Sequence, residues 1–568
     1  MKKTMRFQRI TPILAGLLLG SPVALHAATT MNSFDAPPPR TRREARPTTA
    51  PLTIQQPEVR YTAAQIELIL ERAHNAWAGY VQLRPRLRRG DLHEQAFTHR
   101  AAVLRAQTNA IERLLAAEKR KPTKEGPQTI SDGLTGLDRA TAAVEYDANR
   151  IALRMAQEAV LPPDQPYCVC MAPAFVRVAP LRPATCVPAT EVNLSLAGGE
   201  AESFQVVVVP YWEPIRNVRI QVGELFLRDG IERLPASQVK LWSVESVATS
   251  APLGREHLWP DLLTPLRVFD VPATASQSVL VDVRARAGQP PGLYGGRLTV
   301  KGDDVATMTL ALHVRVRPFA LPEAPPPRVA FRARNDFLQT RFAAPDPSRF
   351  VRTWQHFLAD FDLGLYRKAG PDDSAAGWTP WLGEFPPMPV EALPADPYSP
   401  AAPTSLACRQ AAWAGWNLQR RDPSPRQWLV NGWVSLDPSV PAAGPLLAPL
   451  VRIRWESAVL PNPPGLIHLN PEGDPEPTLR LVALRDGIED YRYLELLAQS
   501  VNEAKTRRAA GWWKRRRWNA LLRVEPQLGD PNRLTPELAT ELLHRREALG
   551  DAIEDAQRLL AKRPPRKR

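Results

Sequence analysis

The stretch LRLVALRDGIEDYRYLELL, residues 479–497, carries the clearest fold signal in this chain. Its large apolar residues recur at spacings of three and four, which predicts an amphipathic α-helix with the charged residues mostly on its other sides. Those charged residues are expected to pair with one another along the helix. Gly487 interrupts the pattern at about 1 kcal/mol relative to Ala, so we expect close packing or a local bend there. The apolar face consists of Leu481, Leu484, Ile488, Tyr491, Leu494 and Leu497.

Around this helix, the composition indicates a folded protein of several domains. The chain has 568 residues, and the usual domain size predicts roughly three or four units. Its 60 prolines are about twice the average share, which favours many connectors and few long strands. The net charge of +14 favours acidic partners such as anionic polysaccharide, lipid head groups or nucleic acid.

The first 28 residues have the pattern of a secretory signal peptide. A positively charged start is followed by a short apolar run around residues 13–19, and small residues for cleavage lie near Ala27 and Ala28. A retained membrane anchor is the alternative, but the apolar run is about half the length that a spanning helix needs. We therefore predict a secreted or periplasmic protein with no transmembrane span after cleavage. Export argues against nucleic acid as a partner.

The four cysteines are Cys168, Cys170, Cys186 and Cys408. Three of them lie within 19 residues, so a disulfide between Cys186 and either Cys168 or Cys170 is expected in an exported chain, with the connectivity left open. A Cys-x-Cys pair without a nearby His or second pair lacks zinc spacing. No metal site and no cofactor are predicted.

The periodicity changes along the chain and indicates a multidomain α+β protein. Helical spacing with breaks at 89–91 and 121–126 gives way to short strands separated by Gly, Pro and Asp turns, as in an antiparallel sandwich. The predicted regions are a disordered linker (29–60), a helical domain (61–161), a β-sandwich (165–322), a reduced (β/α) barrel (323–500) and a basic helical region (501–568).

Tryptophans gather in the block 323–478, which holds eight of the fifteen in the chain. Indole rings suit sugar rings, because they offer a flat apolar face with a donor at the edge. The alternative is that these side chains fill a core. The candidate sugar contacts are Trp378, Trp381 and Trp433.

The C-terminal region joins a basic, Trp-containing stretch at 505–518 to a predicted pair of helices at 538–549 and 553–560. A basic aromatic cluster can bind a membrane surface or an acidic glycan. The interpretation that we favour from sequence is a solvated helix face with its Trp side chains packed inward.

Several segments match a known pattern in order and spacing. They are GGEAESFQVVVVP (198–210), LWPDLLTPL (258–266), QPPGLYGGRLTVKG (289–302), HVRVRPFALP (313–322), CRQAAWAGWNLQ (408–419), WLVNGW (428–433) and PPGLIHLNPEG (463–473). Together with the helix at 479–497 they resemble glycoside hydrolase family 123, with an amino-terminal sandwich and a catalytic barrel. The residues of its structural signature are Arg485, Asp486, Gly487, Ile488, Glu489, Asp490 and Tyr491.

The resemblance implies chemistry whose residues are missing here. In that family an adjacent Asp-Glu pair acts at a strand end: the Glu protonates the glycosidic oxygen and the Asp orients the substrate's own 2-acetamido group, which attacks the anomeric carbon. This sequence contains no Asp-Glu dipeptide. A closed barrel takes about 250 residues, so the roughly 170 between the sandwich and the end of the signature helix predict a reduced or open one. The catalytic pair would lie in the missing part.

Other residues remain as site candidates. Asp336, Glu384 and Asp437 lie near predicted strand ends or tryptophans, and each is an alternative cap, turn or surface residue. His468 replaces an aromatic residue usual in the family and is a candidate ligand contact, or else a packed residue. Glu489 and Asp490 are in the reverse order on a helix, which favours structural ion pairs.

These observations leave three hypotheses. One is an exported hydrolase of N-acetylhexosamine-containing glycans with a rearranged site. The second, which we prefer on mechanism, is a non-catalytic relative that binds such a glycan or a cell-envelope polysaccharide. The third is a non-enzymatic envelope scaffold or partner-binding protein. The oligomeric state is left open.

Overall fold

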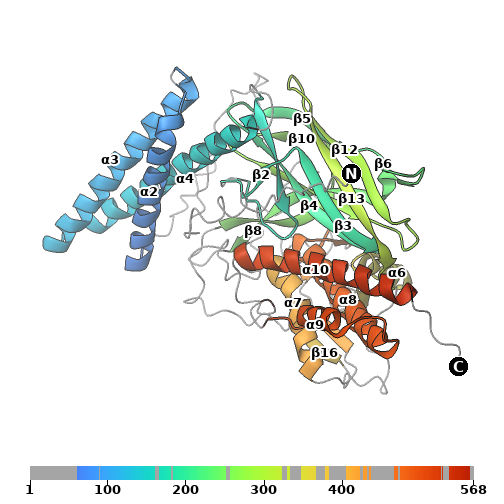
Figure 1. Cartoon of the computed structure of the whole chain (residues 1–568). Helices are drawn as coiled ribbons and strands as arrows, with labels where there is room; N and C mark the ends of the chain where they lie inside the picture. The colour runs from blue at the N-terminus through green and yellow to red at the C-terminus, as the bar shows by residue number, and fades with distance from the viewer. Residues whose placement is uncertain are drawn as a thin grey trace. The chain divides into compact units, whose positions relative to one another are not determined.

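The computed structural model divides the chain into two compact units, one of Leu25–Ala148 and one of Met1–Ala24 with Asn149–Arg568. Figure 1 shows the fold coloured along the chain. The residues that the structure describes are 61–88, 90–159, 165–180, 183–250, 256–322, 329–332, 347–365, 378–382, 405–421, 427–431, 434–435, 466–470, 474–525, 528 and 536–562.

The N-terminal region is helical, as predicted. Thr62 starts the first helix with a capping box, because its hydroxyl accepts from the Gln65 backbone at 3.3 Å while the Gln65 side chain accepts from the Thr62 backbone at 2.8 Å. Buried Arg72 donates to Asp138 at 2.7 Å, which ties the first helix to the third. The elements are α2 (Ala63–Leu83), η1 (Arg84–Arg86), α3 (Leu92–Arg120) and α4 (Gly126–Glu158).

Two mainly antiparallel sheets form the predicted sandwich, and they enclose an apolar core between them. The first sheet has the strand order β2-β1-β4-β11-β8-β9, and its central strand β4 is buried along its whole length. Both faces of β4 are therefore covered, which explains its run of valines. The strands are β1 (Tyr167–Pro173), β2 (Val187–Pro188), β4 (Ala201–Pro210), β8 (Val239–Ser250), β9 (Glu256–Pro265) and β11 (Gln277–Arg284).

The second sheet has the order β10-β5-β12-β13-β3, with β6 and β7 attached beside β12. Its one parallel pair joins β13 to β3. A short turn from β3 leads into β4, so this connection passes from the second sheet to the first. The elements are β3 (Glu191–Gly198), β5 (Ile215–Val222), β6 (Leu225–Leu227), β7 (Arg233–Leu234), η2 (Ala236–Gln238), β10 (Phe269–Val271), β12 (Gly292–Lys301) and β13 (Met308–Ala320).

The predicted reduced barrel appears as short parallel strands with intervening helices. One sheet has the order β15-β14-β17-β16, with every pairing parallel, and a separate sheet has the order β18-β19-β20. Within the described ranges these strands do not close into a ring. The elements are β14 (Val329–Arg332), α6 (Pro347–Ala359), β15 (Gly364–Leu365), β16 (Trp378–Leu382), α7 (Ser405–Arg421), β17 (Gln427–Asn431), β18 (Val434–Ser435), β19 (Ile467–Leu469) and β20 (Pro475–Glu476).

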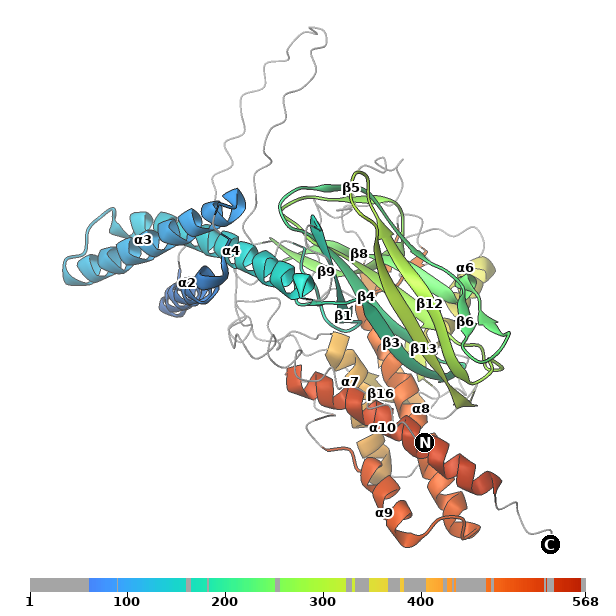
Figure 2. The same ribbon diagram turned by 45° about the horizontal axis from the view of Figure 1, so that its top comes forward.

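Three helices complete the chain: α8 (Leu479–Thr506), α9 (Trp512–Leu521) and α10 (Pro536–Ala561). Figures 1 and 2 show α7, α8 and α10 gathered against one end of the sandwich. The predicted pair of helices at 538–549 and 553–560 is wrong, because α10 continues through both. Gly550 lies in its middle, where a Cβ would approach the Arg317 guanidinium to 2.3 Å, so this glycine serves a close contact and not a break.

The predicted disulfide is absent, since all four cysteines are buried free thiols. Cys168 and Cys170 point to the same side of β1, as residues two apart on a strand must, and their sulfur atoms lie 3.7 Å apart. Burial raises the pKa of both thiols well above its usual value, which keeps them unreactive.

No helix in the described part of the chain is both long enough and apolar enough to cross a bilayer.

Candidate functional site

Helix α8 begins at a cap that also holds it to the strand before it. The Thr478 hydroxyl accepts from the Leu481 backbone at 3.1 Å and donates to the Leu466 carbonyl at 2.7 Å. From Leu479 to Leu494 every residue is buried. The prediction of an amphipathic helix is therefore wrong for this part, because its charged sides are covered as well as its apolar face.

Gly487 marks the closest approach of α8 to a neighbouring helix. A Cβ at this position would lie 2.5 Å from the Arg409 carbonyl oxygen and 3.0 Å from the Arg409 Cα, both in α7. The expectation of close packing at this glycine is confirmed, since only a residue without a side chain lets the two backbones meet.

The charged residues of α8 pair mainly across elements and not along the helix. The Arg485 guanidinium binds Asp282 of β11 at 3.0 Å and donates to the Ser203 hydroxyl of β4 at 2.9 Å. It also contacts Asp486, its neighbour on the helix, at 2.9 Å. Arg485 thus fastens α8 to the first sheet of the sandwich.

One turn further along, Asp490 joins α8 to α7. Arg409 donates to both oxygens of Asp490, at 2.8 and 3.0 Å, and the Trp413 indole donates to the same carboxylate at 3.0 Å. Bidentate pairing of this kind is among the stronger charge-assisted contacts in proteins. Asp490 is thereby fully engaged in structural bonds.

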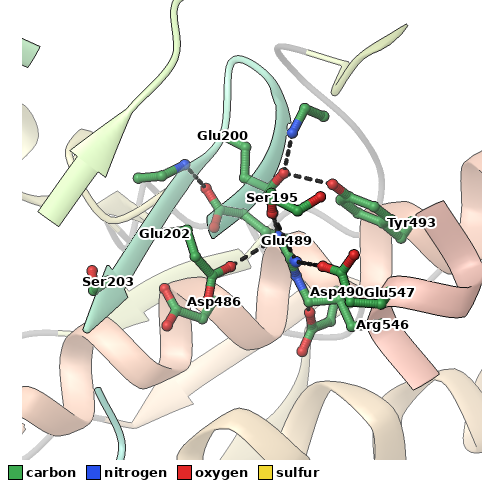
Figure 3. A network of polar contacts seen from close by, with 12 residues as sticks. Ser195, Glu200, Glu202, Ser203, Asp486, Glu489, Asp490, Tyr493, Arg546 and Glu547 are labelled. Carbon is green, nitrogen blue, oxygen red and sulfur yellow. Dashed lines mark hydrogen bonds and ion pairs between the residues drawn. The ribbon is translucent and has the colours of Figure 1, made fainter. Parts of the chain in front are cut away.

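Arg546 of α10 enters the same region from the opposite side. It pairs with Glu200, with Glu202 at 2.8 Å and with Asp490 at 3.2 Å. The Tyr493 hydroxyl donates to Glu200 at 2.6 Å. Figure 3 shows these side chains converging from the β3–β4 connection, α8 and α10.

We call this set the buried ion network; it comprises Arg409, Arg485 and Arg546 with Glu200, Glu202, Asp282, Asp486, Glu489 and Asp490. All are nine-tenths or more buried.

The buried ion network has three arginines and six carboxyl groups, so full ionisation would leave excess negative charge. Burial raises the pKa of Glu202 to about 7, although Arg546 and Arg409 oppose it, and burial also raises the pKa of Asp486 and Glu489. Burial thus favours the neutral, protonated form of these three carboxyl groups more than water does, and the nearby arginines oppose this effect.

Asp282 behaves in the opposite way. Burial alone would raise its pKa, but Arg485 and the Ser203 hydroxyl more than offset burial and hold the pKa below its usual value. Asp282 is therefore a fixed anion at neutral pH and cannot donate a proton.

A second buried pair lies beside the start of α8. Arg480 donates to Asp261 of β9 at 2.8 and 3.0 Å. His468 on β19 is fully buried, and burial lowers its pKa to about 4. His468 has no exposed surface and is packed on all sides, and its assignment as a ligand contact remains a prediction.

An open cleft of about 240 Å³ lies next to the buried ion network. Three aromatic side chains line it: Trp242 of β8, Phe357 of α6 and Phe361 just after α6. The two phenylalanine rings lie 5.2 Å apart. Ligand pockets typically measure roughly 300–1,000 Å³, so this cleft suits one sugar-sized ring or the end of a longer chain.

Charged groups complete the lining of the cleft. Lys240 pairs with Asp360 at 3.0 Å, and Arg284 donates to the Asp360 carbonyl at 2.6 Å. Asp282 and Arg485 also line it, so the cleft borders the buried ion network directly. The arrangement offers fixed polar partners beside an aromatic wall.

Among the predicted site residues whose side chains the structure describes, Arg485 of the signature lines this cleft and His468 does not. Asp336, Glu384, Asp437 and Trp433 lie outside the described residues. Trp378 and Trp381 belong to β16, but their side chains are not described. These assignments remain predictions.

Other tryptophans of the same block follow the core alternative. Trp354, Trp413 and Trp416 are buried in one large cluster with residues of α8 and α10. Trp416 packs edge-on against Tyr491, with ring centres 5.5 Å apart, and its indole donates to the Leu522 carbonyl.

Sequence reasoning missed the cleft and most partners of the signature. Trp242 lies on a sandwich strand far from the Trp-rich block, and no local pattern distinguishes it. Arg409 could have been found from the sequence, because the segment 408–419 matched the family pattern. No pattern in the sequence pointed to Arg546. Among the described side chains, no group of three or more His, Cys, Asp and Glu is arranged to hold a metal ion.

No protein-family model matches this chain, and no curated protein is similar in sequence. A solved structure of a family 123 glycoside hydrolase from Clostridium perfringens aligns over 70% of this chain and 99% of its own, with 10% identity and a TM-score of 0.45. The macrocyclisation catalyst AvmM aligns over 28% and 94%, with 9% identity and a TM-score of 0.17. The periplasmic chaperone SfaE aligns over 25% and 64%, with 11% identity and a TM-score of 0.14. These values are too low to assign a family or a function.

Proposed function

We propose that this chain is an exported, non-hydrolysing relative of the family 123 glycoside hydrolases that binds an N-acetylhexosamine-containing glycan in the cleft at Trp242. The observation that carries the proposal is the combination of this aromatic cleft with a family signature whose carboxyl groups are all buried.

The signature carboxyl groups are unsuited to acid catalysis. Asp486, Glu489 and Asp490 are each at most 1% exposed, so no glycosidic oxygen can reach them. A catalytic acid must come within hydrogen-bond reach of the leaving group. The sequence also lacks the adjacent Asp-Glu pair that the resemblance implies.

Two of the three described carboxyl groups that line the cleft are also committed to other contacts. Asp282 is held ionised by Arg485, and Asp360 is paired with Lys240. Trp242 with Phe357 and Phe361 instead offers an apolar wall for a sugar ring, with charged groups at the edge for its hydroxyl and acetamido groups. An aromatic wall beside paired carboxyl groups supports binding of a glycan without its hydrolysis.

The test measures binding of soluble oligosaccharides of N-acetylglucosamine and N-acetylgalactosamine by calorimetry. Trp242→Ala is expected to weaken binding about fivefold, because an aromatic contact is worth roughly 1 kcal/mol. Trp212→Ala is the matched control, since Trp212 is a half-buried sandwich tryptophan that does not line the cleft.

Three results would contradict the proposal. Release of nitrophenol from an aryl N-acetyl-galactosaminide or N-acetyl-glucosaminide would show an active hydrolase. Absence of any glycan binding by the unchanged protein would instead favour the scaffold hypothesis. Equal loss of binding in both tryptophan variants would place the glycan elsewhere.

A further inference from the structure

Helix α9 exposes two adjacent tryptophans. Trp512 is 55% exposed and Trp513 is 74% exposed, whereas Trp518, later on the same helix, is only 3% exposed. The expectation that these tryptophans pack inward is therefore wrong for two of the three. Trp518 anchors α9 to the core, and this fixes the other two rings at the surface.

The exposed pair forms a compact apolar projection. The two rings lie 4.4 Å apart between centres and meet edge to face at 73°. Exposed contiguous apolar surface of this kind marks an interaction site more often than a single exposed side chain does. Figures 1 and 2 show α9 on the far side of α10 from the sheets of the sandwich.

The charge of α9 indicates the sign of the partner. The helix sequence WWKRRRWNAL contains Lys514, Arg515, Arg516 and Arg517 and no acidic residue. Lys514 pairs with Asp555 of α10 at 2.9 Å. The surface beside the exposed rings is thus strongly basic, which suits an anionic partner.

The geometry of the rings distinguishes an acidic glycan from a lipid surface. A sugar stacks on an open, flat ring face, but the Arg516 guanidinium lies 5.2 Å from the centre of the Trp512 ring, and Trp513 meets the same ring edge to face. Trp side chains at a membrane interface need no open face, because they insert among head groups with their polar edge toward water. The arrangement therefore favours a membrane surface.

We propose that α9 is a peripheral membrane anchor: Trp512 and Trp513 insert into the head-group region of an anionic phospholipid bilayer, and Arg516 and Arg517 bind its phosphates. One short helix of this kind binds reversibly, through buried apolar surface together with attraction to anionic lipid. This inference is independent of glycan binding in the cleft, which lies on other elements.

The test is flotation of the purified full chain with vesicles of phosphatidylglycerol and phosphatidylcholine, compared with vesicles of phosphatidylcholine alone. Trp512→Ala/Trp513→Ala is expected to lower partitioning into anionic vesicles about tenfold, and Arg516→Gln/Arg517→Gln to lower it severalfold. Raised salt is expected to weaken binding of the unchanged protein. All variants keep the same N-terminal segment, so any contribution of that segment to vesicle binding is the same in each. Differences between the variants therefore come from α9.

The matched control is Arg219→Gln/Arg297→Gln, which removes the same charge from exposed positions on β5 and β12. Its partitioning is expected to stay close to that of the unchanged protein. Equal losses in this control and in Arg516→Gln/Arg517→Gln would overturn the proposal, because binding would then follow net charge alone. Failure of the unchanged protein to float with anionic vesicles would also overturn it, as would binding to a soluble acidic polysaccharide without vesicle binding.

Discussion

At the scale of single residues, the signature of α8 serves packing and charge pairing. Gly487 has no side chain, so α7 can pass close by, and Arg485 neutralises Asp282 of the sandwich. The same residues leave no carboxyl group of the motif open to solvent.

Gly487→Ala is expected to destabilise the protein by about 1–3 kcal/mol, because the new Cβ would push against the backbone of Arg409. Urea unfolding monitored by circular dichroism measures the change. Gly79→Ala in α2 is the control, since a Cβ there meets nothing within 4 Å and Ala favours a helix by about 0.5–1 kcal/mol. Equal effects of the two substitutions would refute the packing argument.

Glu202 predicts a pH dependence of stability. Its pKa is about 7 in the folded protein against a usual value of 4.5, so the folded state keeps a proton that the unfolded chain releases between these values. This contribution is complete below pH 4.5, decreases as pH rises and is lost above about 7. At pH 8 we expect Glu202→Gln to keep roughly 1–3 kcal/mol of the free energy of unfolding that the unchanged protein has lost.

Denaturant unfolding at pH 5 and pH 8 tests this expectation, with Glu213→Gln, an exposed sandwich residue, as the control. Asp282 contributes with the opposite sign, because its pKa is lowered and its stabilisation is lost as pH falls through the folded value. A difference between Glu202→Gln and the unchanged protein that does not grow with pH would rule out titration of Glu202.

At the scale of elements, α10 supplies one of the arginines of the buried ion network, whose carboxyl groups come from the sandwich and α8. Arg546 supplies the cation that faces Glu200 and Glu202, and Arg317 of β13 bonds in return to Glu547, Asp551 and Glu554 of α10. One arginine lies on α10 and binds carboxyl groups of the sandwich, and the other lies on the sandwich and binds carboxyl groups of α10. The helix and the sandwich are therefore joined by ion pairs in both directions.

Arg546→Ala is therefore expected to cost about 3–5 kcal/mol, because it leaves buried carboxyl groups without their cation. Arg558→Ala, an exposed change on the same helix, is expected to stay within about 0.5 kcal/mol. Thermal and urea unfolding of both variants measure the two effects. A small loss for Arg546→Ala would mean that the neighbouring carboxyl groups take up protons at little cost.

At the scale of the whole molecule, the two compact units predict two levels of local stability. The amides of α8 and β4 lie in the most buried part of the Asn149–Arg568 unit and should exchange with solvent only when that unit unfolds. Helices α2 and α3 belong to the other unit.

Hydrogen exchange measured by mass spectrometry checks this division. Gly487→Ala is expected to reduce the protection of α8 and β4 together while leaving α2 and α3 unchanged. Equal loss of protection in α2 would show that the two units unfold as one.

The sequence by itself determined the local order of the fold. Periodicity placed the helical region, the sandwich strands, the signature helix and the basic tryptophan stretch, because side-chain spacing repeats with the backbone geometry of helix and strand. It also determined the absence of the adjacent Asp-Glu pair. It did not locate the cleft.

Only the tertiary structure decided which partner each charge meets. The signature charges were expected to pair along their own helix, but Arg485 binds Asp282, Asp490 binds Arg409 and Arg546 enters from α10. Trp242 meets Phe357 and Phe361 across elements in the same way. Such contacts depend on how distant segments pack together, and nothing in the local spacing of α8 encodes them. That packing turned an apparently amphipathic helix into one that is buried on every side.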